Sequence, residues 1–544
     1  MRIMQVYHQI GGGVSTYVNT LNRALAEIDR NNQIFNFVAV SNKELTGYRD
    51  EVSDGIYYRK VGIDFTIHLD DNILLDCLNP SVQESFSEYL DEVNPDIVSF
   101  QYLTRLGGAV VGLAKDKGFP TILTLHDYWT ICPRLFLLKK DLTLCNGPNQ
   151  GTNCVTCVGS GKINQAGMYM LRYQFFRNLL MNQVDKVIAV SNSIKERMVQ
   201  EGIDRSKIIT VYPSVYENDV HPTSGSESNC TSITIGYIGH ISPHKGIHVI
   251  FKSLVDCRNE MIRFHYYGNK EQLYESTISE LSANLRNVSY MGTYFTSDLP
   301  RIFSEIDVLV VPSIVPETGP LVVQEALRHR VPVIGSDLGG IPEYVTDRWG
   351  ALFQAGNVEQ LTDILNRLTT DQIKAWKSNI PKLPSPRCFA EQIMQVYETV
   401  VSEAGTKRQM RVDSRHRYLL KPEARGFLRQ QFIPSQVRQI ADEFSRRGFL
   451  TVSIFGTGEL AQKVSRFLRH QGFEIAAFLD NNAQKWGARI GEVIVLNPAE
   501  WNSVSSSVIL VISDWEHEIM RQLEQMKLTI PVVGLYSYHV EQKD

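Results

Sequence analysis

Short apolar runs alternate with amphipathic stretches along most of this chain, and the alternation starts three separate times. Each apolar run has four to eight residues and ends at Gly, Asn, Ser or Pro, and a stretch with helical spacing follows it. Strands that are apolar throughout are buried on both faces, which is typical of parallel sheets covered by helices. The sequence therefore predicts an α/β protein with more than one parallel sheet.

The three series of strands and helices divide the chain into regions. We expect the first region at residues 1–215 and the second at residues 233–400, with a polar, Ser-containing segment between them. A small third parallel α/β domain is expected at residues 448–544. It follows a basic connector at residues 405–447, which contains 11 Lys and Arg against four Asp and Glu. Domains of roughly 100–200 residues are common, so three domains suit a chain of 544 residues.

Composition and charge exclude several classes of protein. Hydrophobic residues make up 43% and charged residues 21%, which is ordinary for a globular chain and excludes a disordered or collagen-like one. The 55 Lys and Arg against 59 Asp and Glu give a net charge of −4, so we expect no nucleic-acid partner. No apolar run approaches the roughly 18 residues of a membrane-spanning helix, and the N-terminus lacks a signal-peptide pattern. We therefore expect a cytoplasmic protein.

Four loops between a strand and a helix carry residues suited to binding a phosphorylated sugar. Glycines let a backbone approach a ligand closely, a lysine can neutralise a diphosphate, and carboxylates accept hydrogen bonds from hydroxyls. The loops are Gly11-Gly12-Gly13, Gly239 to Gly246 with Lys245, Glu317 to Leu321 with Glu325 on the helix that follows, and Gly335 to Glu343. The alternative for each loop is a structural turn, with Glu325 a solvated helix residue.

The order and spacing of these loops resemble a retaining glycosyltransferase of family 4, over about residues 1–400. The strongest elements are the Glu-x7-Glu pair, the Lys245-Gly246 loop and the Gly339-Gly340-Ile341-Pro342-Glu343 loop. His126, in Thr124-Leu125-His126-Asp127-Tyr128-Trp129, matches the His-Asp segment of that family. The resemblance implies the GT-B fold, in which two Rossmann-like domains face a cleft and the second domain holds most of a nucleotide-sugar donor.

The resemblance also implies roles for individual residues. Glu317, His126 and Lys245 would act in catalysis, with Lys245 on the diphosphate and the other two on the donor sugar. Glu325 would bind the ribose. The remaining expected donor-binding residues are Gly12 and Gly13, which would approach the diphosphate, His240, and the loop residues Gly319, Pro320 and Leu321. The chain departs from the family at His240, where arginine is usual, and a neutral imidazole binds a diphosphate less well than a guanidinium does.

The implied reaction is sugar transfer with retention at the anomeric carbon, without a metal or other required cofactor. The expected partners are a UDP- or GDP-sugar and a glycan or lipid-linked acceptor used in surface polysaccharide synthesis. The basic connector and the aromatic stretch Met168 to Val184 would allow peripheral contact with the inner face of the cell membrane. For the aromatic stretch, a buried interdomain helix is the alternative that we favour, because a one-sided apolar stripe normally faces a core.

Four cysteines lie close together in an insert at residues 130–160. They are Cys132, Cys145, Cys154 and Cys157, and the last two have the C-x2-C spacing of a zinc knuckle. Four thiolates would suit a structural zinc ion that orders a loop with little core of its own. The alternatives are an iron–sulfur cluster, four reduced thiols, or a disulfide in an oxidising compartment.

The small third domain carries a variant of the dinucleotide-binding fingerprint. Gly456 and Gly458 follow its first strand, with Ala461 three residues later, and Asp480 ends the next strand. The domain resembles small nucleotide-binding domains attached to bacterial sugar-modifying enzymes, which implies a nucleotide ligand, and a purely structural role is the alternative. Two rival functions for the whole chain remain: a transferase fused to an NAD-dependent oxidoreductase or epimerase, and a non-catalytic nucleotide-sugar sensor.

Overall fold

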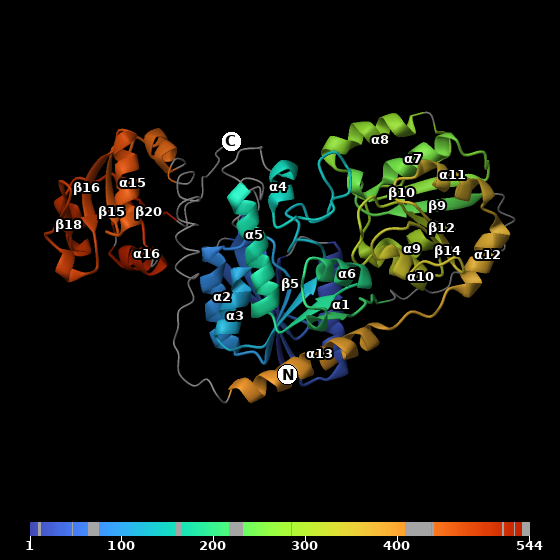
Figure 1. Ribbon diagram of the computed structural model, residues 1–544, viewed down its shortest axis with the longest axis horizontal. Coiled ribbons are helices and arrows are strands. Elements are labelled where there is room, and N and C mark those ends of the chain that lie inside the picture. The colour runs from blue at the N-terminus through green and yellow to red at the C-terminus, as the bar shows by residue number, and fades with distance from the viewer. Residues whose placement is uncertain are drawn as a thin grey trace. The chain divides into compact units, whose positions relative to one another are not determined.

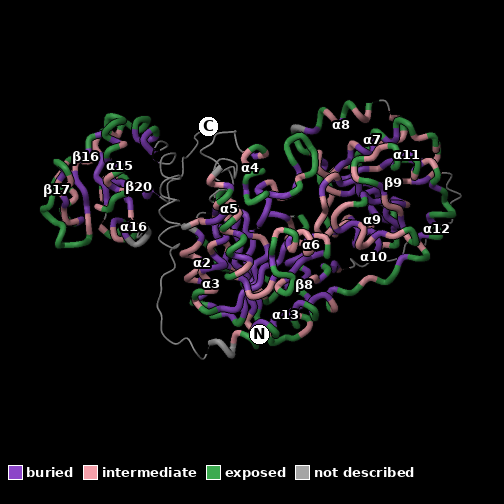
Figure 2. The backbone as a smooth tube through the Cα atoms, in the orientation of Figure 1, coloured by how far each residue is buried: buried purple, intermediate pink, exposed green. Residues whose placement is uncertain are grey.

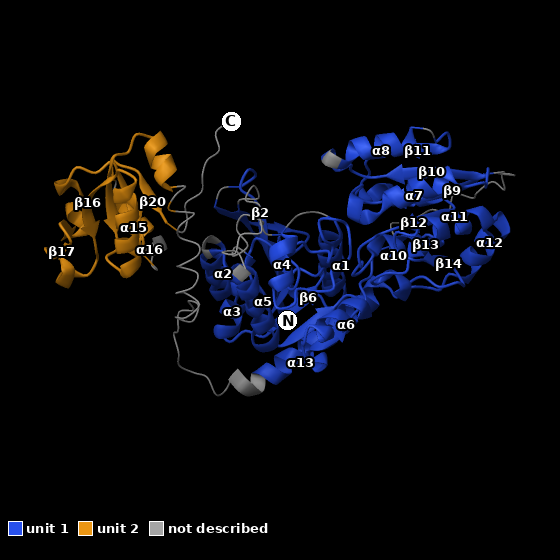
Figure 3. Ribbon diagram, turned by 45° about the horizontal axis from the view of Figure 1, so that its top comes forward, with its two compact units in different colours: residues 1–416 blue, residues 417–544 orange. Residues whose placement is uncertain are grey.

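The computed structural model divides into two compact units, residues 1–416 and residues 417–544 (Figure 3). The residues it describes are 1–8, 12–45, 47–63, 76–158, 166–216, 232–283, 285–408, 437, 440–513, 516–526 and 528–535. Gly11, most of the expected polar segment after residue 216 and most of the expected basic connector lie outside these residues. Each unit is described below by itself.

Unit 1 contains two sheets, and the first of them carries the N-terminal half. Its strand order is β3-β4-β2-β1-β5-β6-β7-β8, and all neighbouring strands are parallel except the β3–β4 hairpin at the edge. Its strands are β1 (Arg2–His8), β2 (Gln33–Ser41), β3 (Tyr48–Ser53), β4 (Ile56–Ile63), β5 (Ile97–Tyr102), β6 (Thr121–Leu125), β7 (Lys186–Ala189) and β8 (Ile208–Thr210). The central strands are buried almost throughout (Figure 2), as the apolar runs predicted.

Helices connect the strands of the first sheet (Figure 1). They are α1 (Gly13–Ile28), α2 (Pro80–Val93), α3 (Ala109–Asp116), α4 (Thr152–Cys157), α5 (Ala166–Asn178) and α6 (Asn192–Gln200). Ser191 caps α6, because its hydroxyl accepts the N–H of Ile194 at 3.4 Å. Apart from α4, these helices bury their apolar faces in one core with the sheet.

The second sheet carries the C-terminal half of unit 1 and is parallel throughout. Its order is β11-β10-β9-β12-β13-β14. The strands are β9 (Ile233–Ile238), β10 (Ile262–Tyr267), β11 (Val288–Tyr290), β12 (Val308–Val311), β13 (Val333–Ser336) and β14 (Gly350–Phe353). The helices are α7 (Ile247–Val255), α8 (Glu275–Ser282), α9 (Leu299–Ser304), α10 (Leu321–Arg328), α11 (Val358–Arg367) and α12 (Thr370–Asn379). Because all strands point the same way, the loops that follow them gather at one edge of the sheet.

The long helix α13 (Pro386–Arg408) returns from the second half to the first. Its buried side chains, including Phe389, Ile393 and Tyr397, belong to the core of the first sheet. The sequence boundaries had placed residues up to 400 with the second half. They differ from the structure because an apolar stripe shows that a helix is buried but does not show which sheet it packs against.

The aromatic stretch forms α5 and the π-helical turn η3 (Leu179–Gln183). Tyr169, Arg172 and Phe176 are at most 3% exposed, and Phe176 packs edge-to-face on the Trp129 ring at a centroid distance of 4.4 Å. The apolar face of this helix therefore packs within the first half of unit 1. Across the described residues, no helix combines the length and hydropathy that crossing a bilayer requires.

Unit 2 has one small sheet of order β17-β18-β16-β15-β19-β20, in which only the β17–β18 pair is antiparallel. The strands are β15 (Thr451–Phe455), β16 (Glu474–Leu479), β17 (Arg489–Ile490), β18 (Val493–Leu496), β19 (Val508–Val511) and β20 (Val532–Gly534). Its helices include α15 (Glu459–His470) and α16 (Glu516–Gln525). The expected third small α/β domain is thus present, alongside the two α/β halves of unit 1.

Candidate functional site

Lys245 and Glu317 form an ion pair where neighbouring strands of the second sheet end. Lys245 lies in the short helix η5 (Pro243–Lys245) after β9, and Glu317 lies in the loop between β12 and α10. Lys245 Nζ is 2.8 Å from Glu317 Oε1, and the Ser313 hydroxyl donates to the same oxygen at 2.5 Å. The exposed fractions of the Lys245 and Glu317 side chains are 33% and 15%, so both can still be reached from solvent.

The contacts of Glu317 keep its carboxylate ionised. Burial acts to raise the pKa of Glu317, but the charge and hydrogen bond of Lys245 and the bond from Ser313 outweigh it and lower the pKa below its ordinary value. The structure therefore places an ammonium group and a permanent carboxylate side by side. A ligand with both phosphate and hydroxyl groups could use them together.

Glycines allow the neighbouring loops to pack closely against the backbone beside this pair. Gly246 has a φ of 72°, and a Cβ there would lie 1.9 Å from the Pro312 carbonyl oxygen. Gly339 has a φ of 66°, and its Cβ would lie 2.4 Å from the carbonyl oxygen of Glu317. The Gly340 N–H donates to that same carbonyl oxygen at 2.5 Å. The Gly339-Gly340 loop thus holds the backbone that carries the Glu317 side chain.

Glu325 lies on the second turn of α10 and differs from Glu317 in its surroundings. Burial raises the pKa of Glu325 to about 7. Among the described residues, no hydrogen bond or ion pair to its carboxylate is found, although its backbone carbonyl oxygen accepts a bond from His329. The structure does not bring Glu325 into contact with the Lys245–Glu317 pair. Its carboxyl group instead retains unused hydrogen-bonding capacity.

His126 follows β6 in the first half and is held as a neutral imidazole. Its Nε2 atom lies 3.0 Å from Gln101 Oε1, and its ring packs edge-to-face on Tyr17 at a centroid distance of 4.5 Å. Burial lowers the pKa of His126 to about 3. The adjacent Asp127 carboxylate accepts the backbone N–H of Trp129 at 2.7 Å. The Asp127 side chain is therefore engaged in a local turn with the backbone that follows it.

The two histidines of the Lys245 loop do not replace the missing arginine. His240 Nδ1 donates to the carbonyl oxygen of Asn269 at 3.2 Å, and burial lowers the pKa of His240. Burial also lowers the pKa of His244 to about 4, and the His244 ring stacks on Phe136 of the cysteine-containing insert at 4.4 Å. Both imidazoles are neutral at pH 7, so Lys245 is the cation of this loop.

The two halves of unit 1 approach each other at the glycine-rich loop and the start of α10. Gly12 has a φ of 72° and open space around the position of a Cβ, whereas a Cβ on Gly13 would lie 3.7 Å from Leu321. The Thr318 hydroxyl donates to the carbonyl oxygen of His126. The residues expected to contact the donor from the two halves of unit 1 therefore lie on loops that are close to each other.

Gly319 and Pro320 precede α10 in the same loop. A Cβ on Gly319 would lie 3.1 Å from Val190 of the first half, tighter than ordinary contact. Pro320 has no backbone N–H, so any anion at this helix start would depend on the N–H groups of Gly319 and Leu321. Glycine at 319 therefore fits a position where the two halves meet closely.

The four insert cysteines are all reduced. Burial and the neighbouring cysteines raise the pKa of Cys154 to about 12, so this group stays a thiol. Among the described residues, no three His, Cys, Asp or Glu side chains are arranged to hold a metal ion. Zinc at Cys132, Cys145, Cys154 and Cys157 stays a prediction.

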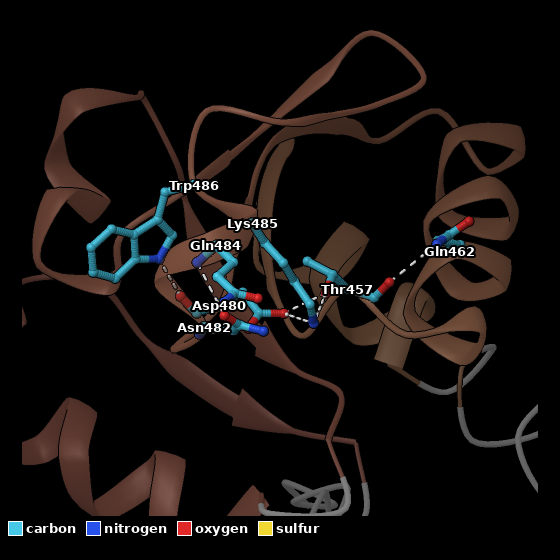
Figure 4. A network of polar contacts seen from close by, with 7 residues as sticks. All are labelled: Thr457, Gln462, Asp480, Asn482, Gln484, Lys485 and Trp486. Carbon is cyan, nitrogen blue, oxygen red and sulfur yellow. Dashed lines mark hydrogen bonds and ion pairs between the residues drawn. The ribbon is translucent and has the colours of Figure 1, made fainter.

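In unit 2, the residues of the dinucleotide-type fingerprint form a closed polar network (Figure 4). Asp480 Oδ2 accepts hydrogen bonds from the Thr457 hydroxyl and from Lys485 Nζ, the latter at 2.8 Å, and Lys485 also donates to Thr457. Asp480 Oδ1 accepts the backbone N–H of Asn482 at 2.9 Å. Burial acts to raise the pKa of Asp480, but these bonds outweigh it and lower the pKa. The carboxylate expected to help bind a nucleotide is therefore already engaged within unit 2.

The two glycines of that fingerprint differ in their surroundings. Gly456 has a φ of 117°, and a Cβ there would lie 2.2 Å from the carbonyl oxygen of Ile512. Gly458 has open space where its Cβ would be. Gly456 is therefore required by the packing of the loop on β19, whereas nothing in the packing requires glycine at 458.

Comparison with known families agrees with this architecture. Residues 11–218 match the family described as "Glycosyltransferase Family 4", and residues 224–381 match "Glycosyl transferases group 1". Residues 450–530 match the family described as "C2185-like, N-terminal". Two family models of glycosyltransferases therefore match consecutive parts of the chain within residues 11–381.

Two curated relatives from Klebsiella pneumoniae are similar to part of the chain. An uncharacterized 41.2 kDa protein in the cps region is 26% identical over 211 residues, covering 38% of this chain and 56% of that protein. An uncharacterized 42.6 kDa protein in the cps region is 24% identical over 271 residues, covering 50% and 65%. The chain thus spans less than two thirds of the length of either relative.

Among solved structures, the Anabaena protein Alr3699/HepE, crystallised with UDP and glucose, has a TM-score of 0.51 and 17% identity. The match covers 75% of this chain and 100% of that one. At this identity the likeness shows the fold alone, which is that of unit 1.

The sequence interpretation missed Ser313 and Gln101, both of which contact predicted site residues. Each is a polar residue in or just after a buried strand, and Ser99 and Gln101 stand at alternate positions in the otherwise apolar β5. Buried polar groups need hydrogen-bond partners, so such residues at strand ends were a usable signal.

Proposed function

We propose that this chain is a retaining glycosyltransferase that moves a sugar from a nucleoside diphosphate donor to a glycan or lipid-linked acceptor in surface polysaccharide synthesis. The observation that carries the proposal is the Lys245–Glu317 pair at the strand ends of the second sheet, 2.8 Å apart and open to solvent. The two glycosyltransferase family matches and the cps-region relatives support it.

In the proposed reaction, the Lys245 ammonium group gives up part of its contact with Glu317. It contacts the donor diphosphate instead and neutralises its charge. The bond between the anomeric carbon and the diphosphate oxygen breaks, and the acceptor oxygen bonds to that carbon on the same face. The acceptor proton passes to an oxygen of the leaving diphosphate. Lys245 stabilises the developing negative charge, and Glu317 accepts hydrogen bonds from the sugar hydroxyls.

Glu325 and His126 complete the proposed donor site. The Glu325 carboxyl would accept hydrogen bonds from the ribose hydroxyls. These bonds would use the capacity for which no partner is found among the described residues. His126 would contact the sugar ring as a neutral group, since burial keeps its pKa near 3. Neither step needs a metal or another cofactor.

The donor is proposed to be a UDP- or GDP-sugar, and UDP is supported by the fold likeness to HepE, which was crystallised with UDP and glucose. A thermal-shift screen tests this directly, because a ligand that binds only the native state raises the melting temperature by mass action. UDP, GDP, UDP-glucose and GDP-mannose should be compared on the same preparation. Failure of every nucleotide to shift the melting temperature would count against the proposal.

The alternative of a non-catalytic sensor makes a different prediction for Glu317→Ala. A sensor would bind nucleotide both as the unmodified protein and as Glu317→Ala, and neither protein would transfer sugar. A fused oxidoreductase or epimerase would instead place chemistry in unit 2. We propose a scaffold or ligand-sensing role for unit 2, because Asp480 is held by Lys485 and Thr457 and no acid–base group is left unpaired in the network of Figure 4.

A further inference from the structure

A chain of buried hydrogen bonds runs from helix α13 to His126 in the first half of unit 1. The Tyr397 hydroxyl donates to Ser99 Oγ at 2.9 Å and accepts from Gln5 Nε2 at 3.3 Å. Gln101 Nε2 donates to Gln5 Oε1 at 2.8 Å and to Ser99 Oγ at 2.9 Å. All four side chains are at most 2% exposed. Each bond here depends on the orientation of the next group.

This network fixes the side-chain amide of Gln101. Both hydrogens of its nitrogen are used by Gln5 and Ser99, so its oxygen must face His126. Reversing the Gln101 amide alone would set two acceptor oxygens, those of Gln101 and Gln5, against each other, and reversing both amides would leave one of the four contacts of the network without a hydrogen. Because an amide oxygen only accepts, the Nε2 atom of His126 must carry the hydrogen in the 3.0 Å contact.

A neutral imidazole with hydrogen on Nε2 has its lone pair on Nδ1. Among the described residues, no hydrogen bond to His126 Nδ1 is found, and His126 is only partly buried. The ring itself is held by Tyr17, which packs in turn on Phe389 of α13 at a centroid distance of 5.1 Å. The imidazole is therefore fixed both in orientation and in tautomer.

We propose that Gln101 is a positioning residue that presents the Nδ1 lone pair of His126 to a hydroxyl group of the bound sugar, with Tyr397 of α13 holding Gln101 in place. The inference rests on the proposed function for the identity of the ligand. It assigns His126 the part of hydrogen-bond acceptor and gives α13 a direct role in the site. Neither Gln101 nor Tyr397 touches the ligand.

The test is the tautomer of His126 measured by long-range ¹H–¹⁵N correlation in the full chain, with the signal assigned by its loss in His126→Asn. The unmodified protein should show hydrogen on Nε2. Gln101→Met, of similar length but without an acceptor, should lose this fixed tautomer. Tyr397→Phe should give a smaller shift in the same direction.

Kinetics supply the second readout. Gln101→Met should lower kcat about tenfold, the value of roughly one hydrogen bond, with a smaller change in KM. The matched control is Asn36→Leu, which removes another buried amide contact, the 2.9 Å bond from Asn22 on α1. It should destabilise the fold while leaving the His126 signal unchanged.

Hydrogen on Nδ1 in the unmodified protein would overturn the proposal, as would a Gln101→Met protein with an unchanged tautomer and unchanged kcat. If Gln101→Met does not fold, the unmodified protein and Tyr397→Phe still decide the question. A correct tautomer in a protein that transfers no sugar would refute the proposed function and leave the positioning role standing.

Discussion

Two regions of this molecule use the same local design with different results. In the second half of unit 1, a loop after β9 brings Lys245 to the carboxylate of Glu317. In unit 2, the loop after β16 brings Lys485 to the carboxylate of Asp480 at the same distance, 2.8 Å. Both pairs lie where parallel strands end, which is where open α/β sheets bind ligands.

The two sites differ in how much hydrogen-bonding capacity their carboxyl groups leave unused. Asp480 also accepts from Thr457 and from a backbone N–H, so both of its oxygens have partners. The unit 1 site has Glu325 on the next helix, with a pKa raised by burial to about 7 and no partner among the described residues. The comparison teaches that topology places candidate groups, whereas unsatisfied hydrogen-bonding capacity distinguishes a binding site from a structural network.

The largest expected effect is at the unit 1 pair. Glu317→Ala should lower kcat for sugar transfer at least about hundredfold, because it removes a preorganised acceptor and leaves the Lys245 ammonium without its partner. The assay is single-turnover transfer with the donor found in the thermal-shift screen. Asp480→Ala is the matched control in unit 2 and should leave kcat unchanged. Equal losses in both variants would break the comparison.

Replacing the lysine of each pair should likewise have a different effect on nucleotide binding in the two units. Lys245→Met should weaken binding of the nucleoside diphosphate about tenfold or more, because a direct charge-assisted contact with phosphate is lost. Lys485→Met should not change it. Isothermal titration with UDP and GDP measures both. A normal affinity in Lys245→Met would show that the diphosphate lies elsewhere.

The Glu325 carboxyl predicts a pH dependence. Its raised pKa of about 7 means that it is largely protonated at pH 6 and ionised at pH 8. Ribose hydroxyls donate best to the ionised form, so donor affinity should rise severalfold from pH 6 to pH 8 and binding near pH 7 should release protons. Glu325→Gln should flatten this dependence. Calorimetry in buffers of different ionisation enthalpy counts the protons.

The smallest expected effect on transfer comes from unit 2. Removing residues 448–544 should leave kcat and KM within about twofold, because the residues proposed for transfer all lie in unit 1. Asp480→Ala should nevertheless destabilise unit 2 by roughly 1–2 kcal/mol, since the Thr457 hydroxyl and the Asn482 N–H lose their acceptor. Urea unfolding followed by Trp486 fluorescence measures this. Loss of transfer on truncation would favour the fused-enzyme alternative.

Much of the fold was predictable because hydrophobic periodicity is local. The apolar run Thr121–Leu125 forms β6, and the amphipathic stretch Glu459–His470 forms α15. The hairpin of β3 and β4 was missed, because β3 is an edge strand of mostly exposed polar residues and carries no apolar run. Edge strands bury little, so their sequences carry a weak signal.

The candidate site was predictable in part for a related reason. Lys245 and Glu317 were identified from loop motifs, and the structure places them in contact. The role of Gln101 was not identified, because its network includes residues from distant parts of the chain. Its partner Gln5 lies 96 residues before it, and Tyr397, which contacts Gln5 and Ser99, lies close to 300 residues after it. The adjacency of Asp127 to His126 in the sequence does not determine the direction of the Asp127 side chain, which accepts the backbone N–H of Trp129.

The sequence by itself determined that three parallel sheets would form and that glycines, a lysine and acids would lie at strand ends, because these follow from periodicity and residue type over short distances. Only the tertiary structure decided which of those groups meet. β9 lies beside β12 in the second sheet, so Lys245 reaches an acid 72 residues away, and α13 crosses to the first half, where Tyr397 joins the network behind His126. Strand order and helix docking are set by the packing of the whole unit, which no local stretch encodes.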